Sequence, residues 1–129
     1  MKNNEAPYHA HIYYTAEDRP AAAALRERFQ TDPAIAPRIS FIGSMTDRPV
    51  GPHPIAQYEV HFVGEARADV VAMIERTGLR ALIHPLTLDD LADHTTLGHW
   101  IGTPIELDLT VLDPPGHNQG VPRFGISDF

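Results

Sequence analysis

The sequence predicts an α+β domain, because segments of strand and helix character follow one another in the order β-α-β-β-α-β. This is the order of a ferredoxin-like sheet. Right-handed crossovers would place both helices on one face of that sheet. A length of 129 residues fits one domain. We expect this domain to span residues 1–112, with a Pro/Gly-rich and irregular tail at 113–129.

The first strand is expected at residues 8–14 (YHAHIYY). Side chains alternate between the two faces of a strand, so His9, His11 and Tyr13 share one face and small or apolar residues share the other. Further strands are predicted at the alternating segments 38–43, 56–63, 80–84 and 105–111.

Two helices are predicted between these strands, at 18–30 and 66–77. The first places Ala22, Leu25 and Phe29 on one stripe. A short third helix is expected at 87–94 (TLDDLADH), and its acidic run is expected to be solvated. The apolar faces of the strands should pack against the two long helices.

The opposite face of the sheet would then carry histidines. Neutral imidazoles are common metal ligands, and two on one strand face form a ready pair. In this topology the first strand lies between the third and the fourth. His9, His11 and His84 are therefore cross-strand neighbours, and we predict that they hold one metal ion. An open face of this kind needs covering, by a homodimer of the dimeric α/β barrel type or by the tail.

Composition narrows the class of partner. The net charge of −7, with only ten lysines and arginines, argues against nucleic acid and against an acidic membrane surface. The absence of cysteine excludes thiolate metal sites and a cysteine nucleophile. No apolar segment has the length of a membrane span, and MKNNEAPY lacks a secretory signal. We therefore expect a cytoplasmic protein.

Four motifs resemble those of the DOPA 4,5-dioxygenase family: YHAHIYY, VGPHP, LIHPLTLDDLADHTTLGHWIG and the following LDL. The resemblance covers about residues 8–112. It implies a ferredoxin-like dimer that cleaves catechols such as DOPA with O₂ and a non-haem ferrous iron. The family's motif histidines fall on His9 and His11 (HxH), His53 (GPHP), His84 (HP) and, after Asp93, His94 (DH).

Extradiol ring cleavage needs Fe(II) with open positions, and three protein ligands leave that room. Zinc or nickel can replace iron in a purified sample. His53 and His94 are the candidate catalytic bases, because imidazole titrates near neutral pH. Tyr13 and Trp100 are the candidate contacts to the substrate ring.

Several alternatives stay open. A carboxylate, either Glu59 or Glu106, could complete the metal site. A dimeric module that binds a metal or a small aromatic molecule without turnover would carry the same histidines. A cofactor-free monooxygenase or isomerase is disfavoured, since base catalysis rarely needs two imidazoles on one strand face.

Overall fold

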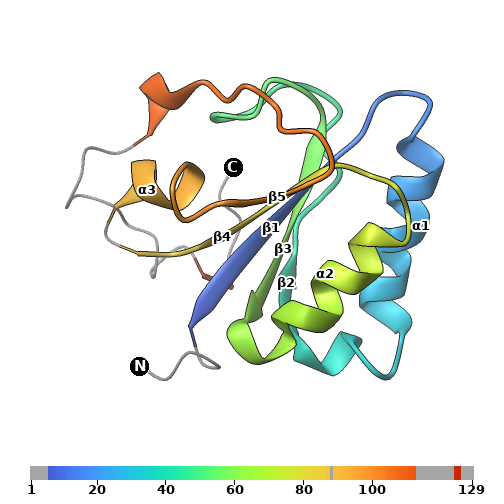
Figure 1. Cartoon of the computed structure of the whole chain (residues 1–129). Coiled ribbons are helices and arrows are strands. Elements are labelled where there is room, and N and C mark those ends of the chain that lie inside the picture. The colour runs from blue at the N-terminus through green and yellow to red at the C-terminus, as the bar shows by residue number, and fades with distance from the viewer. Residues whose placement is uncertain (1–5, 88, 113–123, 126–129) are drawn as a thin grey trace.

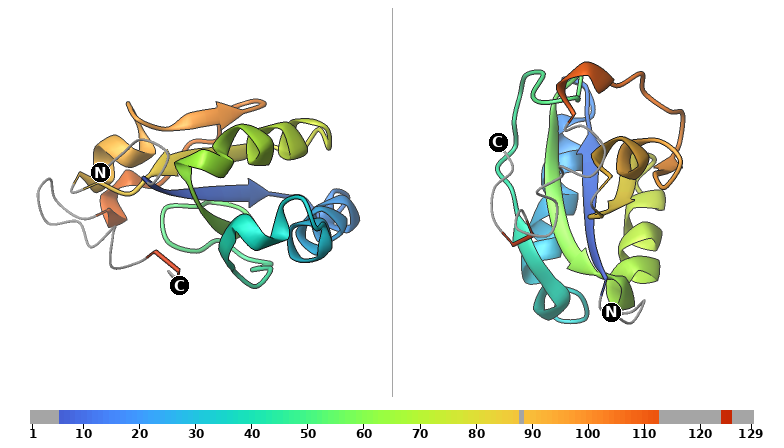
Figure 2. Two further views of the ribbon diagram at one scale, coloured as in Figure 1. Left: turned by 90° about the horizontal axis from the view of Figure 1, so that it is seen from below. Right: turned by 90° about the vertical axis from the view of Figure 1, so that its left-hand side faces the viewer.

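The computed structural model describes residues 6–87, 89–112 and 124–125. They form an α+β fold around one antiparallel sheet of five strands in the order β2-β3-β1-β4-β5. The strands are β1 (Pro7–Tyr13), β2 (Ile39–Ile42), β3 (Gln57–Val63), β4 (Ala81–Pro85) and β5 (His99–Ile101). The predicted α+β class is confirmed, and β1 lies between β3 and β4 as expected (Figure 2).

Three α-helices accompany the sheet: α1 (Arg19–Thr31), α2 (Arg67–Glu75) and α3 (Asp90–His94). Both α1 and α2 cover one face, whereas α3 and the segment that follows β5 lie across the other face (Figure 1). Short 3₁₀ turns occupy Ala36–Arg38, Gly64–Ala66 and Leu109–Val111. No helix in the described residues has both the length and the apolar character that crossing a membrane requires.

The core lies between the sheet and the two long helices. Ala10 and Ile12 of β1 are fully buried there against Leu25 and Phe29 of α1. The apolar faces of β3 and β4 join the same cluster through Val60, Phe62, Ala81 and Ile83. The alternation of β1 therefore sends its histidines to the opposite side of the sheet.

One predicted strand is wrong and one was missed. Residues 105–111 form no strand; they run as an irregular segment that ends in a 3₁₀ turn at Leu109–Val111. The fifth strand is instead His99–Ile101, which pairs with β4. The predicted irregular tail, 113–129, lies outside the described residues except for Phe124 and Gly125, which lie in a turn.

Candidate metal and active site

The face of the sheet opposite α1 and α2 carries a buried cluster of histidines. His9, His11 and His84 are at most 2% exposed. The chain's own segments cover this face, so its burial does not require a second copy of the chain. His53 from the loop before β3 lies on His11 with ring centroids 4.1 Å apart, and His94 of α3 lies on His84 at 4.2 Å.

His11 and His84 face each other through their Nε2 atoms, which are 3.0 Å apart. Nδ1 of His84 donates to the Pro85 carbonyl (2.8 Å), and Nδ1 of His11 donates to Oε1 of Gln57 (3.0 Å). Each neutral ring has one proton, and both protons are thus on Nδ1. Two lone pairs consequently point at one another with no proton between them.

Near neutral pH neither His11 nor His84 gains the second ring proton that would remove this contact between lone pairs. Burial lowers the pKa of His11 to about 4, although the nearby Glu59 carboxylate acts in the opposite direction. Burial also holds the pKa of His84 well below its usual range, and the neighbouring His94 and His11 lower it further. Both rings are therefore neutral, which is the form that binds a metal ion.

His9 completes the three-histidine group that was predicted from the sequence. One ligand atom from each of His9, His11 and His84 lies within 4.8 Å of the others. Neither ring nitrogen of His9 has a hydrogen-bond partner among the described residues, and the ring is completely buried. A buried polar group without a partner is costly, so His9 is suited to an ion that the protein takes up.

A second group, composed of His9, Glu59 and His61, meets the same distance condition. The backbone N–H of Gly125 donates to Nδ1 of His61 (2.9 Å), so the ring proton of His61 is on Nε2. That Nε2 lies 3.5 Å from Oε2 of Glu59. His61 therefore presents a proton, not a lone pair, to this group, which makes it a poorer metal site than the first.

His53 is held by Tyr13 beneath Trp100. The Tyr13 hydroxyl donates to Nδ1 of His53 (2.7 Å), and the Tyr13 ring stacks on Trp100 with centroids 5.8 Å apart. Burial lowers the pKa of His53 and raises that of Tyr13. Tyr13 and His53 are thus both neutral, and the Tyr13 hydroxyl proton lies in the hydrogen bond to Nδ1 of His53. Tyr13 is only 1% exposed. Its hydroxyl contact in the structure is with His53, and its contact with the substrate ring stays a prediction.

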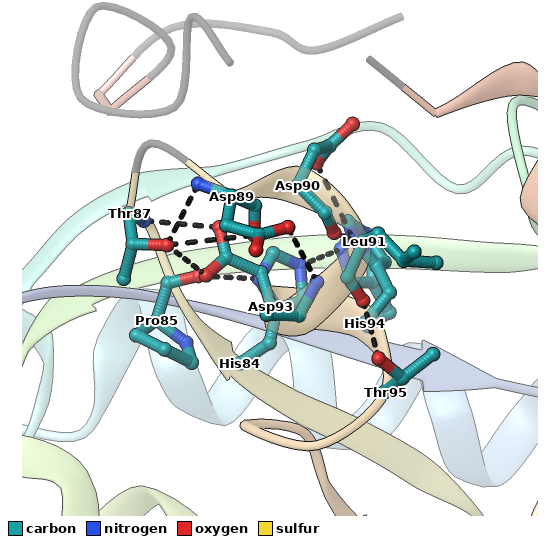
Figure 3. A network of polar contacts seen from close by, with 11 residues as sticks. His84, Pro85, Thr87, Asp89, Asp90, Leu91, Asp93, His94 and Thr95 are labelled. Atoms are coloured by element: carbon teal, nitrogen blue, oxygen red, sulfur yellow. Dashed lines mark hydrogen bonds and ion pairs between the residues drawn. The ribbon is translucent and has the colours of Figure 1, made fainter. Parts of the chain in front are cut away.

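His94 is positioned by a polar network at the start of α3 (Figure 3). The Thr87 backbone N–H and hydroxyl both donate to the Asp93 carboxylate, at 2.9 and 2.6 Å. Asp89 caps the helix by accepting from the Ala92 N–H (3.0 Å). Asp93 is completely buried and Asp90 nearly so, which corrects the expectation of a solvated acidic run.

The ring of His94 has a defined tautomer. Nδ1 of His94 donates to the Asp90 carbonyl (2.8 Å), which leaves Nε2 as an acceptor.

Replacing Asp93 by alanine should loosen α3 from the end of β4. Hydrogen bonds to a charged acceptor typically contribute about 1.5–3 kcal/mol each, so we expect the free energy of unfolding to fall by at least about 2 kcal/mol. Urea denaturation measures this loss. Leu91→Ala, at an exposed position of the same helix, is the control and should change little. Equal stability of the Asp93→Ala and Leu91→Ala variants would contradict the anchoring role.

A cavity of about 280 Å³ lies next to His94, between β5 and the segment that replaces the predicted last strand. Its wall contains Trp100, Ile105, Glu106 and Leu107. The N–H of Asp108 donates to the Pro52 carbonyl (2.9 Å), which joins this wall to the loop that carries His53. The cavity therefore has a candidate base, His94, and an aromatic wall, Trp100.

The structure brings together most of the side chains predicted to form the site. His9, His11, His84, His53 and His94 form one cluster; Trp100 lines the cavity beside it. Glu59 lies on the sheet face with His61, whereas Glu106 lies in the cavity wall and in neither metal group. Sequence reasoning missed Gln57, although its place at the start of a strand of the histidine face was a usable signal.

Comparison with known proteins gives a consistent assignment. Residues 8–111 match the model of the Dopa 4,5-dioxygenase family. A DOPA 4,5-dioxygenase from Amanita muscaria is 35% identical over 113 residues, and an uncharacterized 21.2 kDa protein from Botryotinia fuckeliana is 31% identical over 115. Each alignment covers 81% of this chain, but only 49% and 62% of those relatives.

A crystal structure from Nostoc punctiforme, of a protein provisionally assigned as a dioxygenase, superimposes with a TM-score of 0.71 at 33% identity. That match covers 84% of this chain and 91% of the other. The sequence motifs, the histidine cluster and these relatives agree, and the chain belongs to the Dopa 4,5-dioxygenase family.

Proposed function

We propose that this protein is a ring-cleaving extradiol dioxygenase that acts on a catechol, with O₂ as co-substrate and Fe(II) held by His9, His11 and His84. The observation that carries the proposal is the 3.0 Å approach of the His11 and His84 Nε2 atoms with both Nδ1 protons turned away. A cation bound to both Nε2 atoms would replace the repulsion between their lone pairs by attraction to the ion.

The residues present fit such an ion. The Nε2 atoms of His11 and His84 carry no proton and lie 3.0 Å apart, close enough for both to bind one ion. The unpartnered ring of His9 supplies the third nitrogen. A ferrous ion bound there would supply the Lewis acid and the redox partner that ring cleavage by O₂ requires. Glu59 is the nearer candidate for an additional carboxylate.

The remaining residues would handle the substrate and its proton. In this proposal the catechol ring enters the cavity beside Trp100, with its hydroxyl groups toward the histidines. Nε2 of His94 is an acceptor because its Nδ1 donates to a backbone carbonyl, so His94 can take a proton from a catechol hydroxyl. His53 accepts the hydrogen bond of the Tyr13 hydroxyl at Nδ1, so its own ring proton is on Nε2 and His53 would act there as a hydrogen-bond donor on the other side of His11, instead of as the base predicted from the sequence.

Anaerobic reconstitution tests the proposal. The metal-free chain is loaded with ferrous ion and mixed with a catechol, and air is then admitted. We expect a yellow ring-opened product that contains both atoms of O₂, measured by absorbance and by mass spectrometry with labelled O₂. If iron binds stoichiometrically and no catechol in a broad panel is cleaved, the protein is a binding module and the proposed activity is wrong.

The ferredoxin-like assignment and the homodimer belong to this proposal as well. The strand order around β1 supports the first. For the dimer, the histidine face is already covered by the chain's own segments, so a second copy would have to contact another surface. A single monomeric species in sedimentation at micromolar concentration would exclude the dimer.

A further inference from the structure

Among the described residues, the cavity beside His94 combines a largely apolar wall with one carboxylate. Ile105, Leu107 and Leu109 provide aliphatic surface, and Trp100 provides an aromatic face. Glu106 is the charged side chain of the wall, and among the described residues it makes no hydrogen bond or ion pair. No lysine or arginine lines the cavity within the described part of the chain.

We propose that this cavity selects catechols whose ring substituent carries an ammonium group, and that it disfavours those whose substituent carries a carboxylate. This inference rests on the proposed catechol substrate and specifies its chemical class. Glu106 would attract the ammonium group, and Trp100 would add cation–π attraction. A carboxylate would meet the like charge of Glu106, and no lysine or arginine of the described lining would offset that repulsion.

The residues that line the cavity indicate which part of the substrate would meet Glu106. His94 forms the end of the cavity toward the metal group, because its ring lies 4.2 Å from that of His84. Catechol hydroxyl groups directed at the histidines would leave the ring substituent toward the rest of the lining, which includes Glu106. The bond between Asp108 and Pro52 holds that segment in place.

The whole chain adds to this selection. Its net charge of −7 with neutral histidines raises the local concentration of cations and lowers that of anions. Glu106 is exposed, so its contribution is partly screened by water and salt. We therefore expect about a tenfold preference for an ammonium over a carboxylate substituent of similar length, which decreases as salt is added.

Trp100 is the single tryptophan of the chain, and so its fluorescence reports directly on the cavity. Binding is measured by fluorescence quenching on the full chain without O₂, which makes the result independent of turnover. The matched probes are dopamine, 4-ethylcatechol and 3-(3,4-dihydroxyphenyl)propionate. We expect affinity to fall in that order. Glu106→Gln should bring the dopamine and propionate affinities within about twofold of each other.

Glu75→Gln is the control, since Glu75 is an exposed carboxylate at the end of α2, on the other side of the sheet. It should retain the preference for dopamine. The inference is overturned if the propionate binds as tightly as dopamine, if Glu106→Gln leaves the ratio unchanged, or if no probe quenches Trp100. Failure of the dioxygenase proposal is recognised separately, by absence of the ring-opened product while the binding order persists.

Discussion

Replacing His84 by alanine is expected to weaken ferrous ion and zinc binding by more than 100-fold and to abolish ring cleavage. The variant removes one of the two Nε2 lone pairs that face each other at 3.0 Å. Disturbing residues that merely support metal ligands already costs 10- to 100-fold in affinity, so losing a ligand should cost more. Metal titration by calorimetry measures the change.

The stability of the protein provides an independent measurement of the same effect. A metal at 100 times its dissociation constant should raise the free energy of unfolding of the natural chain by about 2.7 kcal/mol. The His84→Ala variant should show no such increase. His99→Ala is the matched control, because His99 is an exposed histidine of β5. Retention of wild-type metal affinity by His84→Ala would remove His84 from the ligand set.

Acidification should unfold the metal-free protein between about pH 6 and pH 4. Burial lowers the pKa of His9, His11, His53 and His84, so the folded state resists protonation that the unfolded state accepts below about pH 6.5. Where the unfolded state binds more protons, stability decreases as pH falls. The contribution of these histidines to the free energy of unfolding is thus fully present above their unfolded-state pKa of about 6.5. It is lost as the pH falls toward their lower folded-state pKa.

The size of this effect follows from the pKa of about 4 for His11. Each such histidine costs about 1.4 kcal/mol per pH unit in this interval, and His11 alone would cost about 3 kcal/mol by pH 4. Typical domains are stable by only about 5–15 kcal/mol, so several such histidines suffice to unfold this one. Urea denaturation across this pH range, with a chelator present, measures the slope.

Single substitutions separate the contributions to this pH dependence. His11→Gln should lower the slope by about one proton, because a neutral amide replaces a titrating ring. Leu91→Ala, at an exposed position without a titrating group, should leave the slope unchanged. A stability that is constant from pH 6.5 to 4.5 would show that the buried histidines are protonated in the folded state, contrary to this prediction.

The sequence was sufficient to predict the main part of the fold because burial follows the alternation of each long strand. In β1, Ala10 and Ile12 enter the core while His9 and His11 enter the other face. The strand order could be predicted as well, since right-handed crossovers leave few arrangements for this order of elements.

The end of the chain could not be predicted by the same reasoning. IELDLTV alternates better than HWI, yet a strand forms only where a partner edge is available. His99–Ile101 occupies the free edge of β4, and Gly102, with a φ of 75°, turns the chain away from the sheet. Residues 105–108 then run beside the loop that carries His53 and do not pair with a strand. The N–H of Asp108 donates to the Pro52 carbonyl of that loop.

The candidate site was predictable in its histidines but not in their supporting contacts. Spacing on the strands places the three proposed ligands together. The tautomers depend on Gln57, on the Pro85 carbonyl and on Gly125, which are 46, 1 and 64 positions from the rings they contact. Periodicity carries no information about such contacts. Asp93 was likewise assigned to solvent, because its partner Thr87 becomes its neighbour only when the turn before α3 forms.

The bond from Asp108 to Pro52 has a consequence for protein engineering. It makes the loop before β3 and the wall around Glu106 a single unit for recombination, although about fifty positions separate them in the chain. Chimeras with homologues that exchange one of these segments alone should displace His53 relative to the cavity wall around Glu106. Exchanging both together should keep their contact intact.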